Sequence, residues 1–106
     1  MNLDSLTKTE KDILEELKSV MDPEVAVNVV DLGLIYEIHY KEEQKRIHVV
    51  MTLSTRGCPL GDTIMRNIEV VIEDKHPNMD VHVELTWEPE WSPELITDDG
   101  RKAIDQ

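Results

Sequence analysis

Basic residues, cysteine and phenylalanine are scarce in this sequence of 106 residues. It contains 11 lysines and arginines against 23 aspartates and glutamates, which gives a net charge of −12 at pH 7. A protein this acidic repels phosphate groups, so nucleic acids and anionic membranes are poor partners. There is one cysteine and no phenylalanine. Because a lone thiol cannot form a disulfide within the chain, we expect packing alone to hold the fold.

Long hydrophobic runs are also missing. No apolar stretch approaches the roughly 20 residues that span a bilayer. Residues 1–12 are polar and mixed in charge, unlike a secretory signal or a transit peptide. We therefore expect a soluble protein of the reducing cytoplasm. The length suits one compact unit, so residues 1–106 are interpreted as a single domain.

Common catalytic motifs are absent too: the sequence has no G-x-G-x-x-G, P-loop, G-x-S-x-G or H-E-x-x-H pattern. Three of the four histidines fall on the outward face of predicted strands, together with Glu37 and Glu84. These histidines are His39, His48 and His82. No pair of them has the spacing of a structural zinc motif. We interpret them as solvated surface residues and leave metal binding unassigned.

The N-terminal third predicts an amphipathic helix. Thr7 and Thr9 each stand three residues before an acid, which is the spacing of a capping box. Apolar residues then recur at helical spacing as far as Met21, before Asp22-Pro23 stops the helix. The apolar stripe consists of Ile13, Leu14, Leu17, Val20 and Met21.

Alternating apolar residues then predict two antiparallel strands, over residues 33–40 and 46–54, joined by a polar turn at 41–44. The inward set of the first strand is Leu34, Tyr36, Ile38 and Tyr40, and that of the second is Ile47, Val49, Met51 and Leu53. Pairing Ile38 with Ile47 puts both sets on one side of the hairpin.

The remaining sequence completes the predicted fold. Residues 64–72 repeat at helical spacing, residues 80–87 alternate as a third strand, and Ser92-Pro93 precedes a short helix around 94–97. Because a helix joins the second and third strands, they should be parallel. We predict a two-layer α+β fold with an α-β-β-α-β core, a small mixed three-stranded sheet, both helices on one face and a short C-terminal helix. The strand order stays open.

Cys58 is the first candidate for chemistry. If Pro59 is the first helical residue, Cys58 is the N-cap, where free backbone N–H groups favour a thiolate. Arg56 adds a nearby cation. Such surroundings lower a cysteine pKa from ~8.5 into the range 3.5 to 7.5, which gives a nucleophile or a soft-metal ligand. The alternative is a buried cysteine that packs as a small hydrophobe.

Other candidates surround this turn in the sequence. Ser54 and Thr55 place hydroxyls three and four residues before Cys58, where they can face the thiol or bond the backbone of the turn. Asp22-Pro23-Glu24 offers two carboxylates beside a stiff proline. Trp91 lies in a proline-flanked loop, where it can pack inward or stand at a partner surface.

Four segments together resemble a known family. These are DPE at 22–24, DLGLIY at 31–36, MTLSTRGCPL at 51–60 and WEPEW at 87–91. In order and spacing they resemble the small iron–sulfur assembly domain of the MIP18-like family, which includes SufT-type maturation factors and the PaaD protein of phenylacetate degradation. The likeness covers roughly residues 10–100. It implies an α-β-β-α-β core and a role in assembling or delivering iron–sulfur clusters.

The resemblance also implies a functional surface at Cys58, supported by Asp22, Glu24, Ser54 and Thr55. One thiol cannot hold a cluster alone, so no cofactor should be tightly bound and any cluster at Cys58 is shared or transient. Expected partners are iron–sulfur assembly proteins or client apoproteins, and a homodimer is open. The function is then accessory rather than enzymatic.

Three other interpretations stay open. In the first, the chain is a structural adaptor that docks partners through Trp91 and its acidic surface. In the second, it is a small thiol-dependent enzyme in which Asp22 or Glu24 is the base for Cys58. In the third, it is an accessory protein of the phenylacetate pathway, although the cysteine-rich tail of the longer PaaD-type proteins is missing here.

Overall fold

The computed structural model describes residues 3–57 and 60–104 and has the predicted α+β architecture. The core elements are α1 (Lys8–Glu16), β3 (Ile35–Lys41), β4 (Arg46–Met51), α2 (Gly61–Lys75) and β5 (Asp80–Leu85). The sheet order is β3-β4-β5, with β3 antiparallel and β5 parallel to β4. This settles the strand order and confirms the predicted parallel pair.

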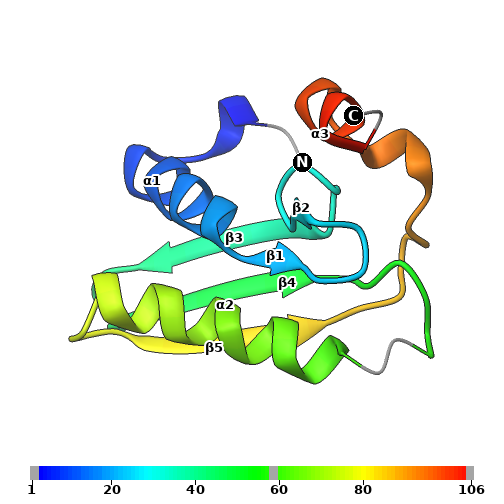
Figure 1. Ribbon diagram of the computed structural model, residues 1–106. Helices are drawn as coiled ribbons and strands as arrows, with labels where there is room; N and C mark the ends of the chain where they lie inside the picture. Colours follow the sequence, from blue (N-terminus) through cyan, green and yellow to red (C-terminus); the bar gives the residue numbers. More distant parts are fainter. Residues whose placement is uncertain (1–2, 58–59, 105–106) are drawn as a thin grey trace.

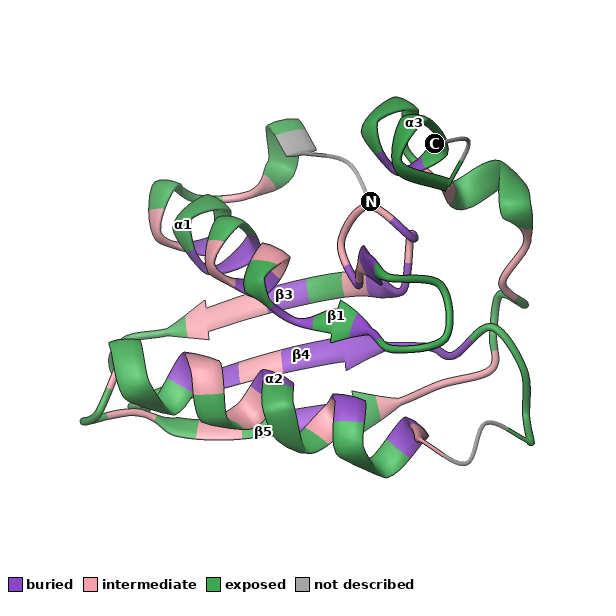
Figure 2. Cartoon of the chain, viewed as in Figure 1, coloured by how far each residue is buried: buried purple, intermediate pink, exposed green. Residues whose placement is uncertain are grey.

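Helices α1 and α2 cover the same face of this sheet, α1 beside β3 and α2 beside β5 (Figure 1). The buried residues of both helices lie on the sides that face the strands (Figure 2). Fully buried side chains from both layers form the core, among them Ile13, Leu17, Ile38, Ile47, Met51, Ile64, Ile68 and Ile72. The two-layer prediction is therefore confirmed.

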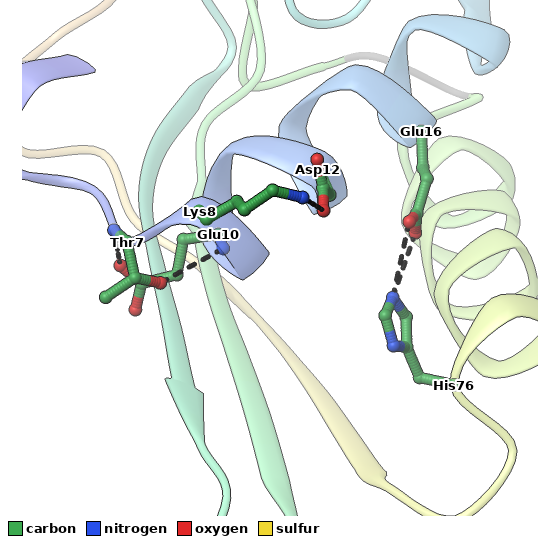
Figure 3. Close-up of polar contacts among 6 residues, drawn as sticks. All are labelled: Thr7, Lys8, Glu10, Asp12, Glu16 and His76. Carbon is green, nitrogen blue, oxygen red and sulfur yellow. Dashed lines mark hydrogen bonds and ion pairs between the residues drawn. The ribbon is translucent and has the colours of Figure 1, made fainter.

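Helix α1 begins with the predicted capping box at Thr7. The Thr7 hydroxyl accepts the Glu10 N–H at 3.2 Å, and Glu10 Oε1 accepts the Thr7 N–H at 2.9 Å (Figure 3). The second oxygen of Glu10 accepts the N–H of Tyr40 in β3, also at 2.9 Å. Burial alone raises the pKa of the Glu10 carboxyl, but the bonds from Thr7 and Tyr40 outweigh it and bring the pKa below its ordinary value.

The first helix is shorter than predicted. Helix α1 stops at Glu16 and tightens into a 3₁₀ turn, η2 (Leu17–Ser19), followed by the short strand β1 (Met21–Asp22). Val20 is buried, but Met21 is 47% exposed, so its place in the apolar stripe was wrong. β1 pairs with β2 (Val27–Asn28) in a small antiparallel sheet. This pairing keeps the backbone of Met21 and Asp22 extended, although the sequence pattern predicts that the helix continues to Met21.

The hairpin register differs from the prediction by two residues. Ile38 pairs with Val49, not with Ile47, because Lys41 belongs to the strand and the turn ends at Lys45 with φ 53°. A shift of two keeps every side chain on its face, so Ile38 and Ile47 still point inward.

An irregularity in β3, between Ile35 and Glu37, does change which side chains face the core. An extra residue in one strand turns the following side chains over, as in a β-bulge. Ile35 is buried, whereas Tyr36, which we predicted to point inward, is partly exposed.

The C-terminal region contains more helix than predicted. A 3₁₀ turn, η3 (Pro93–Leu95), stands near the expected short helix, and Ser92 precedes it without a side-chain cap bond. It is followed by α3 (Asp98–Ile104), which the sequence pattern did not indicate. A further 3₁₀ turn, η1 (Leu3–Ser5), precedes α1. No helix in the described residues is long and apolar enough to cross a membrane.

One ion pair joins the C-terminal ends of the two core helices. His76, the C-cap of α2, lies with Nε2 at 3.1 and 3.3 Å from the two carboxylate oxygens of Glu16 in α1 (Figure 3). Both side chains are only about one-fifth exposed.

We expect Glu16→Gln to lower the free energy of unfolding by about 1 kcal/mol at pH 6, measured by urea denaturation, because the pair is shielded from solvent. Glu15→Gln is the matched control, since Glu15 pairs with Lys18 at 3.1 Å but is 73% exposed. Its loss should stay within about 0.5 kcal/mol. Equal losses in both variants would refute the specific role of the Glu16 and His76 contact.

Candidate functional site

The loop that leads toward Cys58 forms one wall of an open hollow of about 410 Å³. The opposite wall is the segment that follows β5. The lining residues are Leu53, Ser54, Thr55, Arg56, Trp87, Glu88, Glu90 and Trp91. The structure thus brings together two of the four family-like segments, MTLSTRGCPL and WEPEW, which lie about 30 residues apart in the sequence.

A cation–π contact between Arg56 and Trp87 connects the two walls of the hollow. The guanidinium carbon of Arg56 lies 4.7 Å from the centre of the Trp87 ring. Such contacts contribute about 0.5–1 kcal/mol at exposed sites. Arg56 is therefore held against Trp87, and its positive charge stands two residues from Cys58 in the chain.

The two hydroxyls on the loop wall are available for contacts. Ser54 and Thr55 are exposed and line the hollow. Within the described residues, neither side chain has a hydrogen-bond partner. Both hydroxyls can therefore donate to or accept from a group that enters the hollow.

The Trp91 side chain is held in place by a hydrogen bond to Leu32. Its indole N–H donates to the carbonyl oxygen of Leu32 at 2.8 Å, and its ring packs partly against the core. Of the two roles that the sequence left open, the structure shows inward packing, while the ring still lines the hollow. Buried indole N–H groups normally find such a partner.

The two carboxylates of the DPE segment do not line this hollow. Asp22 is only 4% exposed, and its Oδ1 accepts the N–H of Glu24 at 2.9 Å. The backbone carbonyl oxygen of Asp22 also accepts the N–H of Ala26. Both hydrogen bonds stabilise the turn that joins β1 and β2. Glu24 is exposed.

Cys58 and Pro59 lie outside the described residues. The structure nevertheless shows that α2 begins at Gly61, with Leu60 as its N-cap. The sequence made Cys58 the N-cap on the condition that Pro59 is the first helical residue, and a helix that begins at Gly61 does not meet that condition. Gly61 itself packs closely on Leu53, because a Cβ at position 61 would lie 2.6 Å from Leu53 Cδ1.

Sequence reasoning missed one residue that supports the WEPEW wall. The Tyr36 hydroxyl donates to the carbonyl oxygen of Pro89 at 2.8 Å, and the Glu88–Pro89 peptide bond is cis. Burial raises the pKa of the Tyr36 phenol, and the nearby Thr52 hydroxyl offsets part of the rise. The irregularity in β3 turns Tyr36 away from the core. No local sequence pattern predicts this irregularity.

The chain is similar to proteins that are named for iron–sulfur protein maturation. A "Fe-S protein maturation auxiliary factor" of Porphyromonas gingivalis is 37% identical over 93 residues, 88% of each chain. The "Fe-S protein maturation auxiliary factor YitW" of Bacillus subtilis is 34% identical over 89% of this chain and 91% of that protein.

Solved structures agree with this similarity. The crystal structure of a DUF59 domain, described as of unknown function, from Bacillus anthracis matches with a TM-score of 0.87 at 28% identity and covers 98% of both chains. The resemblance to the MIP18-like family is thereby confirmed. Because a family model described as iron–sulfur cluster assembly protein also matches residues 10–86, the chain belongs to the iron–sulfur cluster assembly protein family.

Proposed function

We propose that this protein is an accessory factor in the maturation of iron–sulfur proteins and acts through Cys58 and direct protein contact. The observation that carries the proposal is the hollow between the loop at 53–56 and the segment at 87–91, next in sequence to the only thiol. The names of relatives that cover most of the chain support the same function.

The surroundings of Cys58 in the sequence favour a thiolate. Arg56 places a positive charge two residues before it in the chain. A nearby cation stabilises an anionic sulfur. A thiolate is the form that binds iron, so Cys58 can offer one ligand to a cluster.

The cluster in this proposal is cargo and is never held by one chain alone. A single thiolate leaves the other cluster ligands to be supplied by a partner. The exposed hydroxyls of Ser54 and Thr55 can hydrogen-bond to groups of that partner. The same reasoning makes the chain an auxiliary protein rather than a turnover enzyme.

Charge indicates which partner surface fits. Glu88 and Glu90 are exposed on one wall of the hollow, and the whole chain carries a net charge of −12. A basic surface on the assembly protein or client apoprotein would complement this wall and speed the encounter. The proposed partner is therefore a protein with basic residues around its cluster site.

We expect Cys58→Ser to reduce the activity of iron–sulfur enzymes about tenfold in cells that depend on this protein, while the purified variant keeps its melting temperature. Asp12→Asn, a change on the exposed side of α1, is the control and should leave these activities unchanged. Full activity of the iron–sulfur enzymes with Cys58→Ser would overturn the proposal.

Anaerobic purification with iron and sulfide analysis separates two versions of this function. A carrier should copurify with substoichiometric iron and sulfide that is lost in Cys58→Ser. A pure adaptor should contain neither and should lose partner binding in Trp91→Ala while Cys58→Ser binds normally. That second result would refute the role of the thiol.

A further inference from the structure

Three histidines form a row across the sheet face that α1 and α2 leave uncovered. His39, His48 and His82 stand directly opposite one another on β3, β4 and β5. The ring centres of His39 and His48 are 6.0 Å apart, and those of His48 and His82 are 5.4 Å apart. Residues at one register position on adjacent strands share a face, so the three imidazoles are neighbours on a single surface.

Carboxylates hold two of these rings. Glu84 Oε1 lies 3.0 Å from His48 Nε2, and Glu37 Oε1 lies 2.8 Å from His39 Nε2. If Nε2 of His48 donates this hydrogen bond to Glu84, its Nδ1 atom is the nitrogen left to bind a metal ion. Metal-binding histidines typically have this arrangement, in which a carboxylate fixes the tautomer and raises the basicity of the other nitrogen.

We propose that His48 and His82 bind one divalent transition-metal ion on this face, with Glu84 as the residue that positions His48. The two imidazoles form the closer pair of the row, and His82 is exposed. No group of three His, Cys, Asp or Glu side chains among the described residues converges on a metal position. In this proposal the two imidazoles are the only protein ligands, and water completes the coordination of the ion.

The chemistry of the face selects the kind of ion. Imidazole suits zinc, nickel and copper, whereas calcium and magnesium prefer oxygen ligands. The carboxylates of Glu37 and Glu84 add negative charge next to the rings and favour any cation. Both His48 and Glu84 are reachable from solvent, so binding requires no opening of the core.

Titration calorimetry with Ni²⁺ at pH 7.5 tests this site. All proteins carry Cys58→Ser, so that the thiol cannot contribute and the result does not depend on the proposed maturation function. We expect one site in the parent protein. His48→Gln and His82→Gln should each weaken Ni²⁺ binding at least tenfold. Glu84→Gln should weaken it about tenfold, because Glu84 no longer orients the His48 ring.

His76→Gln is the matched control, because His76 pairs with Glu16 at the ends of the core helices. It should bind Ni²⁺ as tightly as the parent. A paramagnetic Ni²⁺ ion should also broaden the ring proton signals of His48 and His82 before those of His76. Absence of binding in the parent protein, or unchanged affinity in either His48→Gln or His82→Gln, would overturn the proposal.

Discussion

Gly33→Ala is expected to lower the free energy of unfolding by about 3 kcal/mol, because the new methyl group meets two separate penalties. Gly33 has φ +80°, a conformation that L residues with a Cβ avoid. A Cβ at this position would also lie 2.4 Å from the carbonyl oxygen of Leu95 and 2.6 Å from its Cβ. Backbone atoms cannot rotate away, so the C-terminal segment would have to shift.

Gly57→Ala is the matched control for this prediction. Gly57 lies on the loop toward Cys58, and a Cβ built there has no heavy atom of the described residues within 4 Å. Its effect on urea denaturation should stay within about 0.5 kcal/mol. A Gly33→Ala protein as stable as the parent would contradict the packing of Leu95 against the turn that precedes β3.

Glu10→Ala is expected to lower the free energy of unfolding by about 2–3 kcal/mol, since one buried carboxylate serves two backbone groups. The variant removes half of the capping box and leaves the Tyr40 N–H without its acceptor. Asp12→Asn, in the same helix but exposed, should change the free energy by less than about 0.5 kcal/mol. Equal effects of the two changes in thermal or urea denaturation would refute the link that Glu10 makes between α1 and β3.

The same carboxylate predicts a pH dependence. The pKa of Glu10 is lower in the folded protein than its ordinary value, so the unfolded chain binds the proton more readily. Its contribution to stability is therefore complete above the ordinary glutamate pKa and is lost as the pH falls through the lowered value. Glu10→Gln should flatten the acid limb of the stability curve relative to Asp12→Asn. An unchanged acid limb would contradict the lowered pKa.

The elements set by local pattern were predictable from the sequence. The capping box at Thr7, the inward faces of β4 and β5 and the parallel pair follow from spacing and connectivity alone. The predicted inward faces of Ile38 and Ile47 stayed correct although their register was wrong, because a shift of two residues conserves the alternation. Periodicity reports which face of an element is buried and not which residue it pairs with.

Features that depend on distant contacts could not be predicted. The extra residue at Tyr36 is stabilised by a bond to Pro89, 53 residues later. Helix α2 starts at Gly61, although Pro59 is the stronger local signal for a helix start. The hollow itself combines two segments that nothing in the linear sequence places side by side.

The anchoring of the C-terminal segment has a consequence for recognition. Trp91 is tied to Leu32, and the Thr97 N–H donates to the carbonyl oxygen of Asp31 at 2.8 Å, so both attachments end on the same short turn. Displacing the indole would break the first of these bonds. The Trp91 ring and α3, which begins at the next residue after Thr97, Asp98, therefore share one anchoring turn at residues 31–32.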